Sequence, residues 1–269
     1  MDSPLRNYCE YTHRSYVRPS TDRNTPALRG SICELVPMAC TGYELPFPKI
    51  SSMRHAWLPT MTRKIQKALF IGAHPDDIEL GCGGTIAKFI ERDIEPYCLV
   101  ATRGGTAAFG HDRVQETATA LNTLGVPMEN IVQHDFPDAR LDSVPLFELI
   151  RCIENTVASI KPDRVYTMFR EDRHQDHRAV FHASDVACRK VPQILVYETP
   201  SAYPNFVPTF FEALSPAQIQ LKKTALAAHV SQGERIYMDH EAITAACKFR
   251  ATQVGLNQCE GFIAHKFIF

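Results

Sequence analysis

The sequence has no excess of positive charge. Its 29 lysines and arginines are matched by 30 aspartates and glutamates, which gives a net charge of -1 over 269 residues. Proteins that bind a phosphate backbone need a positive electrostatic potential over their surface. The composition therefore disfavours a nucleic-acid partner.

Long hydrophobic runs are also missing. No stretch approaches the ~20 consecutive apolar residues that a membrane-spanning helix requires. The first residues, Met1 to Arg6, contain no apolar run, and the acidic residues Glu10, Asp22 and Glu34 are atypical of a transit peptide. We therefore expect neither a membrane span nor a targeting leader.

Cysteine is present, but not in pairs. The nine cysteines are an odd number with no Cys-x-x-Cys spacing, a pattern that predicts free thiols in a reducing, cytoplasmic compartment. A chain of this size with 45% hydrophobic residues buries enough surface to fold without disulfides or a structural metal. Any bound metal is therefore expected to serve chemistry.

The chain divides into two parts of different character. Residues 1–64 are rich in Pro, Arg, Ser and Thr and show no sustained hydrophobic period, so we predict an irregular N-terminal extension. Residues 65–269 are predicted to form the working domain. Met61 lies just before the first convincing strand, and whether it is the true start stays open.

From Lys67 onward, short apolar runs alternate with segments of helical period. Strands are predicted near 68–71, 97–100, 130–132, 164–168 and 193–197. Helices are predicted through 86–90 after a glycine-rich turn, over 113–124 and 146–160, from about 176, and as an amphipathic helix over 218–229. This alternation predicts an α/β fold, a Rossmann-like and mostly parallel sheet with helices on both faces. If the strand order is the common 3-2-1-4-5, strands one and four are neighbours, and the loops that follow them face each other.

Those two loops carry His and Asp together. The first reads Ala73-His74-Pro75-Asp76-Asp77-Ile78-Glu79 and the second Asp172-Arg173-His174-Gln175-Asp176-His177. Two His and one carboxylate, with a fourth position open to water, suit a catalytic zinc. The three-residue spacing within each motif favours Asp77 over Asp76 as the carboxylate ligand.

The remaining polar side chains of the two motifs then have other roles to fill. Asp76 is free to act as a base on metal-bound water, and His174, with Asp176 near enough to orient it, can donate a proton or stabilise an oxyanion. Either motif alone also fits a turn that caps a helix. Their occurrence together at compatible strand ends favours a site.

The sequence from Lys67 to Phe269 resembles the LmbE-like, or PIG-L, family of zinc-dependent N-deacetylases. The resemblance is carried by the two motifs and their flanks, by Arg113-x-x-Glu116 leading to Leu124-Gly125-Val126, by Phe136-Pro137-Asp138, and by His229-Val230-Ser231-Gln232. Gln175 stands where many members have Pro. The segment up to Thr60 lies outside the resemblance.

The resemblance implies removal of an N-acetyl or related N-acyl group from an amino sugar, most often in an N-acetylglucosamine-containing small molecule. It implies one zinc per chain, and the residues that it assigns are the ligands His74, Asp77 and His177, the general base Asp76, and an acid or oxyanion partner His174 oriented by Asp176. Whether the chain forms a homo-oligomer stays open.

Three residues are candidates for contact with the substrate. By looser alignment, Arg113 and Asp138 fall where the family contacts the sugar. Arg103 follows the second predicted strand on the same edge of the sheet, where it would either line the pocket or point into solvent. The group that carries the amino sugar, and the acyl group removed, are not encoded in any pattern that we can read.

Other readings of the same residues stay open. His74-x-Asp76 with a distant His is also the ligand pattern of non-haem iron oxygenases, although these usually have a β jelly roll. A metal-binding module without activity is a third reading, but it would not need Asp76 or His174. The glycines of 81–84 do not match Gly-x-Gly-x-x-Gly and are expected to allow close helix packing. Glu79 and His229 are expected to be structural.

Overall fold

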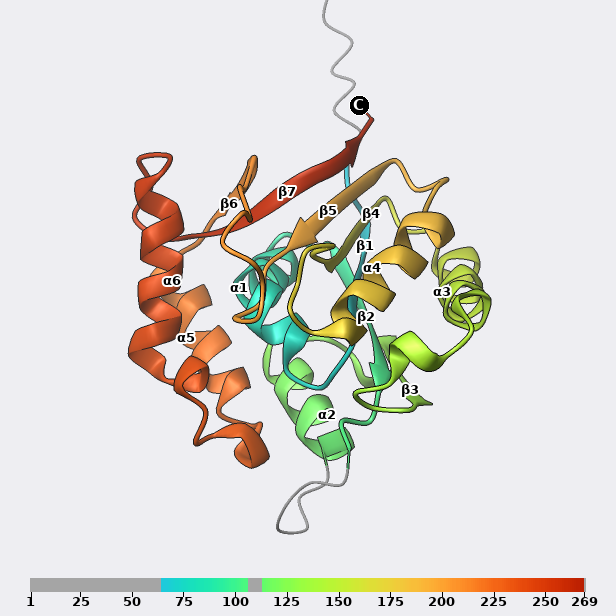
Figure 1. Cartoon of the computed structure of the whole chain (residues 1–269). Coiled ribbons are helices and arrows are strands. Elements are labelled where there is room, and N and C mark those ends of the chain that lie inside the picture. The colour runs from blue at the N-terminus through green and yellow to red at the C-terminus, as the bar shows by residue number, and fades with distance from the viewer. Residues whose placement is uncertain (1–63, 106–112, 269) are drawn as a thin grey trace, which may run out of the picture. The chain divides into compact units, whose positions relative to one another are not determined.

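The computed structural model describes residues 64–105 and 113–268. Its strands are β1 (Lys67–Gly72), β2 (Glu95–Thr102), β3 (Ile131–Phe136), β4 (Arg164–Met168), β5 (Gln193–Tyr197), β6 (Phe210–Ala213) and β7 (Cys259–Phe267). Its α-helices are α1 (Asp77–Glu91), α2 (Arg113–Thr123), α3 (Leu146–Ile160), α4 (Gln175–Ala187), α5 (Pro216–Leu226) and α6 (His240–Thr252) (Figure 1).

The strands form a seven-stranded sheet in the order β3-β2-β1-β4-β5-β7-β6. Strands β1 to β5 are parallel, whereas β7 runs antiparallel to β5 and β6 antiparallel to β7. The predicted α/β fold class and the predicted order of the first five strands are confirmed. Strands β1 and β4 are neighbours, so the loops that follow them meet at one edge of the sheet.

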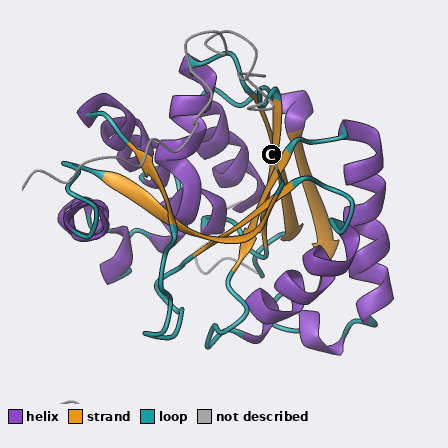
Figure 2. Cartoon of the chain, turned by 90° about the horizontal axis from the view of Figure 1, so that it is seen from above, coloured by secondary structure: helices purple, strands orange, loops and turns teal. Residues whose placement is uncertain are grey.

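Helices cover both faces of this sheet (Figure 2). On one face α5 packs against α1, α2 and α6, and on the other α3 packs against α4. Strands β1, β4 and β5 are consequently buried almost along their whole length, which explains their continuous apolar runs.

Two glycines of α1 allow the helix to pack closely. A Cβ atom at Gly81 would overlap the ring of Tyr197, and one at Gly84 would overlap Leu214. The Tyr197 hydroxyl in turn donates to the carbonyl of Ile71 at 2.7 Å. The packing role predicted for this glycine-rich segment is confirmed, and α1 begins directly at the first His/Asp motif.

The last third of the described chain was predicted least well. The predicted amphipathic helix near 218–229 is present as α5, but β6, β7 and α6 were not predicted. β6 is only four residues long and pairs with a strand almost fifty residues later, so no local pattern marks it. α6 buries Ile243, Cys247 and Ala251 at helical spacing, a signal that could have identified it.

The predicted N-terminal extension lies outside the described residues except for Lys64. None of the helices described is long and apolar enough to cross a membrane.

Candidate metal centre

The two His/Asp motifs lie side by side at the carboxyl ends of β1 and β4. The first motif follows β1 and leads into α1, and the second leads into α4 (Figure 1). The rings of His74 and His177 are 5.3 Å apart between centroids, although the residues are separated by 103 positions. The convergence predicted from the strand order is present in the structure.

Three side chains form a triangle of contacts, in which Asp77 meets the two histidines through different carboxylate oxygens. His177 Nε2 is 3.3 Å from His74 Nδ1 and 3.3 Å from Asp77 Oδ1, and His74 Nδ1 is 3.3 Å from Asp77 Oδ2. A tetrahedral zinc with bonds of about 2.0–2.1 Å holds its ligand atoms about 3.3–3.4 Å apart. The donor set therefore fits zinc, with a fourth position left for water.

His174 also brings a ring nitrogen near this triangle. Nitrogens of His74, His174 and His177 lie within 4.8 Å of one another, as do donor atoms of His74, Asp138 and Asp176. Both groups include His74, and in the second its Nε2 lies 3.0 Å from Asp176 Oδ2 and 3.4 Å from Asp138 Oδ1. The tighter spacing favours Asp77 over His174 as the third ligand.

Each donor is held by neighbours. Asp77 Oδ2 accepts hydrogen bonds from the backbone amides of Ala73 at 3.1 Å and His74 at 2.7 Å. His177 Nδ1 faces Asp172 Oδ2 at 3.0 Å. Asp172 is fully buried and also accepts from the Thr199 hydroxyl at 3.0 Å. A carboxylate behind a ligating imidazole fixes its tautomer and orientation.

The electrostatics of the cluster favour a cation. Burial opposes protonation of His74, but hydrogen bonds to Asp176 and Asp77 outweigh it and raise its pKa to about 10. Burial likewise opposes protonation of His177, and the charge of Asp77 and the contact with Asp172 raise its pKa to about 9. In the same way, the imidazoles hold the pKa of Asp77 well below its usual range despite burial. The site is therefore organised to hold positive charge.

Asp76 is buried beside the triangle in an unusual backbone conformation. It caps α1 at φ 94°, a left-handed conformation that is uncommon outside glycine. Burial and the neighbouring charge of Asp77 raise the pKa of its carboxyl to about 7, against the opposing charges of His229 and Arg113. A general base works best when its pKa lies near the operating pH.

His174 lines the same cavity as Asp76 and caps α4. Its Nδ1 accepts a hydrogen bond from the backbone amide of Asp176 at 3.2 Å, and its ring stacks on His177 with centroids 4.7 Å apart. Burial and the nearby imidazoles lower the pKa of His174. Its neutral ring therefore carries the proton on Nε2, as a hydrogen-bond donor.

The carboxylate of Asp176 contacts other groups than the ring of His174. Asp176 Oδ2 lies 3.0 Å from His74 Nε2, and Oδ1 accepts from the amide of Leu141 at 2.9 Å. In this structure Asp176 thus contacts His174 through its backbone amide. Its role as the residue that orients the His174 imidazole stays a prediction.

The metal-ligand and catalytic candidates line or border a cavity of about 290 Å³. The residues that line it are His74, Asp76, Asp77, Leu80, Arg113, Asp138, His174, His177, Thr199, Pro200, Ser201, Gln232 and Tyr237.

Of the three predicted substrate residues, the structure brings two into this cavity. Arg113 Nη2 donates to the carbonyl of Pro75 at 2.8 Å and lies 3.7 Å from Asp76 Oδ2, and Asp138 Oδ1 is 3.4 Å from His74 Nε2. Arg103 is not among the lining residues; its side chain is 60% exposed, and its Nε lies 3.5 Å from Asp135 Oδ1.

Some residues of the site were missed. Asp172 lies within the second motif, but spacing alone does not say that its carboxylate turns back to His177. No carboxylate stands at metal-ligand spacing from His229 along the chain, but its Nε2 lies 2.9 Å from Glu79 Oε1, 150 residues away, and both side chains are buried. This pair adjoins the predicted base, because the charges of both residues act on the pKa of Asp76. Thr199 and Tyr237 come to line the cavity only through the tertiary fold, so no local sequence pattern marks them.

Comparison with known proteins gives concordant matches. The model of the PIG-L family, described as GlcNAc-PI de-N-acetylase, matches residues 69–188. The uncharacterized deacetylase YaiS of Escherichia coli is 41% identical over 180 residues, which cover 65% of this chain and 96% of that protein.

Solved structures share the fold. The conserved protein TT1542 from Thermus thermophilus aligns with a TM-score of 0.65 and 27% identity, over 77% of this chain and 97% of that one. The N,N'-diacetylchitobiose deacetylase from Pyrococcus horikoshii aligns with a TM-score of 0.63 and 21% identity, over 74% of this chain and 83% of that one.

Proposed function

The chain belongs to the PIG-L family of deacetylases, and from that premise we propose that it is a zinc-dependent hydrolase of an N-acetylated amino sugar. The observation that carries the proposal is the triangle of His74, Asp77 and His177 donor atoms with the buried carboxylate of Asp76 beside it. The family description supports an N-acetylglucosamine-containing substrate.

One zinc per chain would be held by His74, Asp77 and His177. When bound, zinc lowers the pKa of a ligating water and polarises an amide carbonyl. Asp76 accepts the proton of the attacking water, since the pKa of its carboxyl is raised to about 7. The carbon–nitrogen bond then breaks, and acetate and a free amino sugar leave.

His174 is proposed to stabilise the oxyanion. Its Nδ1 accepts from the backbone of α4, so the neutral ring presents Nε2–H as a donor. A donor that is fixed before the reaction stabilises developing charge without reorganisation. The proton that the leaving amine requires is available from Asp76 after it has deprotonated water, which makes one carboxyl the acid and the base in turn.

The sugar would lie over this cavity. Arg113 of α2 and Asp138, after β3, line this cavity, and a guanidinium donor and a carboxylate acceptor suit recognition of sugar hydroxyls. Six cysteines in the described part of the chain are free thiols, which supports a cytoplasmic location.

The iron-oxygenase reading is less well supported. It needs Asp76 as the carboxylate ligand, whereas Asp77 is the residue whose oxygens contact both His74 and His177. The mostly parallel sheet also differs from the jelly roll on which that ligand pattern is usual.

Amine release from a panel of N-acetylglucosamine conjugates tests the proposal. We expect release by the zinc-loaded protein and loss of release with a chelator. Absence of release from every conjugate, or oxygen uptake with iron and 2-oxoglutarate in its place, would overturn the proposal.

A further inference from the structure

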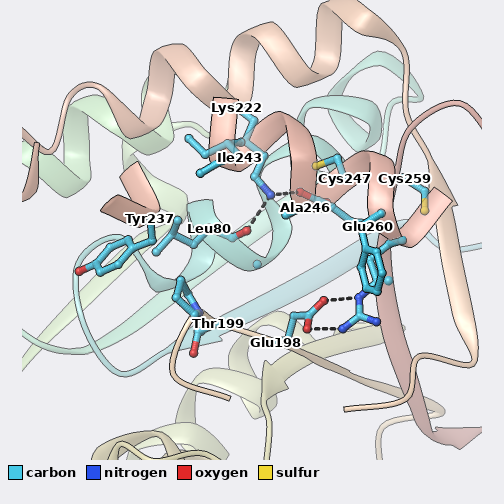
Figure 3. Close-up of a pocket in the computed structure, with 16 residues that line it drawn as sticks. Leu80, Glu198, Thr199, Lys222, Tyr237, Ile243, Ala246, Cys247, Cys259 and Glu260 are labelled. Carbon is cyan, nitrogen blue, oxygen red and sulfur yellow. Dashed lines mark hydrogen bonds and ion pairs between the residues drawn. The ribbon is translucent and has the colours of Figure 1, made fainter. Parts of the chain in front are cut away.

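A second cavity of about 310 Å³ lies next to the candidate metal centre (Figure 3). It is lined by one face of α6, the start of β7, the segment after β5, and parts of α1 and α5. The residues that line it are Leu80, Gly81, Glu198, Thr199, Pro200, Lys222, Tyr237, Ala242, Ile243, Ala246, Cys247, Phe249, Arg250, Cys259, Glu260 and Gly261.

The two cavities are adjacent and share part of their lining. Leu80, Thr199, Pro200 and Tyr237 line both of them. Thr199 ties this wall to the metal centre, since its hydroxyl lies 3.0 Å from Asp172 and 3.3 Å from His177 Nδ1. A substituent of a molecule bound at the metal centre would therefore have the second cavity as its neighbour, beside Tyr237.

The charged residues of the second cavity are already paired with each other. Lys222 Nζ donates to Glu260 Oε1 and to the carbonyl of Leu80, each at 2.6 Å. Arg250 makes a bidentate contact with Glu198, from Nε to Oε1 at 2.6 Å and from Nη2 to Oε2 at 2.5 Å. Figure 3 shows both pairs at the wall. A charged ligand would have to break one of them.

The remaining wall is small and apolar. Ala242, Ile243, Ala246 and Cys247 recur at helical spacing along α6 and turn one face of that helix to the cavity. The alanines leave the space that longer side chains would fill. Ligand cavities of roughly this size, about 300 Å³ and above, are mostly apolar with a few fixed polar groups.

We propose that this cavity binds an apolar, uncharged group attached to the amino sugar, so that the substrate class is an N-acetylglucosaminide with an alkyl or aryl substituent. The inference rests on the proposed function, because the sugar is placed at the metal centre. The shared lining places the cavity beside the sugar, and the paired charges with the alanine-lined face of α6 supply the selectivity.

The test compares octyl and methyl N-acetylglucosaminides, in both anomers, as substrates of the zinc-loaded protein. Because burial of each methylene contributes about 0.8 kcal/mol, we expect kcat/KM for the octyl substrate to exceed that for the methyl substrate by at least about tenfold. Ala246→Phe should reduce the octyl value to the methyl value and leave the methyl value unchanged.

Ala245→Phe is the matched control. Ala245 is the preceding residue of α6 and is exposed, but it does not line the cavity. This variant should keep the octyl preference. Equal kcat/KM for the two substrates in the native protein, or an equal loss on both in Ala246→Phe, would overturn the inference.

A binding measurement separates this inference from the proposed function. If neither glycoside is hydrolysed, the proposed function fails, and calorimetric titration with octyl N-acetylglucosaminide tests the cavity alone. Binding by the native protein and by Ala245→Phe, but not by Ala246→Phe, supports it, and absence of binding to the native protein contradicts it. A dimer that Ala246→Phe dissociates, without an octyl preference, would show that a second copy covers the cavity and would also contradict it.

Discussion

The carboxylate of Asp172 lies 3.0 Å from Nδ1 of His177. This contact is on the side of the ring away from the metal site, and the other ring nitrogen, Nε2, faces Asp77 and His74, each at 3.3 Å. The orientation of the histidine therefore depends on a residue that is not itself a candidate ligand.

Asp172→Asn is expected to weaken zinc binding by about 10- to 100-fold, because an orienting carboxylate raises the basicity of the imidazole and fixes its tautomer. Competition titration with a chromophoric chelator measures the affinity. Asp185→Asn is the control, since Asp185 pairs with His265 at 2.8 Å on the surface. An unchanged affinity in Asp172→Asn would contradict the account.

The pH dependence of activity should report Asp76. A general base must be ionised, so kcat/KM is lost as the pH falls through the pKa of its carboxyl, which burial and the charge of Asp77 raise to about 7. Bound zinc lowers this pKa further. The acidic limb is therefore expected at or below pH 7.

The charge of Arg113 lowers the same pKa, so Arg113→Gln should move the limb to higher pH. Arg103→Gln, which changes an exposed arginine beside Asp135, should leave it in place. The measurement is the pH at which kcat/KM falls to half its maximum. Arg113 is also a candidate sugar contact, so its replacement would change the maximal kcat/KM as well. If the acidic limb of the kcat/KM profile keeps its pH or shifts to lower pH in Arg113→Gln, the result would argue against Asp76 as the base.

The left-handed backbone at Asp76 should cost stability. Asp76→Gly removes a side chain from φ 94°, and urea unfolding with a chelator present should show a gain of about 1 kcal/mol. Burial contributes in the same direction, because a carboxyl whose pKa rises from 3.8 to about 7 in the folded protein destabilises it increasingly between those pH values. The gain should thus be larger at pH 8 than at pH 4.

Asp93→Gly provides the comparison, at φ 54° on an exposed loop. It should relieve strain without a pH-dependent component and without loss of activity, whereas Asp76→Gly should be inactive. A less stable Asp76→Gly protein would show that the conformation is not strained.

The boundary near residue 64 can be tested by truncation. The buried core described for this chain begins at Ala68, and the family match begins at residue 69. A chain that begins at Met61 is therefore expected to fold and to bind one zinc. Insoluble or metal-free protein would show that the preceding segment is integral to the domain.

Much of the fold and of the metal centre could be predicted because the relevant patterns are local. The apolar runs of β1, β4 and β5 mark strands that are buried on both faces, and His74 and Asp77 are brought together within one turn at the start of α1. The strand order then places His177 beside them. The five strands follow from these short-range features, whereas their order was the common one assumed for this fold class.

The residues that could not be predicted depend on long-range packing. His229 and Glu79 are 150 residues apart, so spacing along the chain does not reveal their contact. The strand β6 pairs only through β7, and Tyr237 reaches the cavity from a short turn between α5 and α6. Arg103 lies on the predicted edge of the sheet but outside the cavity, because a long charged side chain on a loop gains more from hydration than from burial.

The most direct test of the central claim measures amine release and zinc content together, in the native protein and in Asp76→Asn. Asp76 is adjacent to the triangle but is not part of it, so Asp76→Asn should keep one zinc per chain while kcat falls by about 10²- to 10⁴-fold. Full deacetylase activity in Asp76→Asn on every accepted substrate would contradict the account.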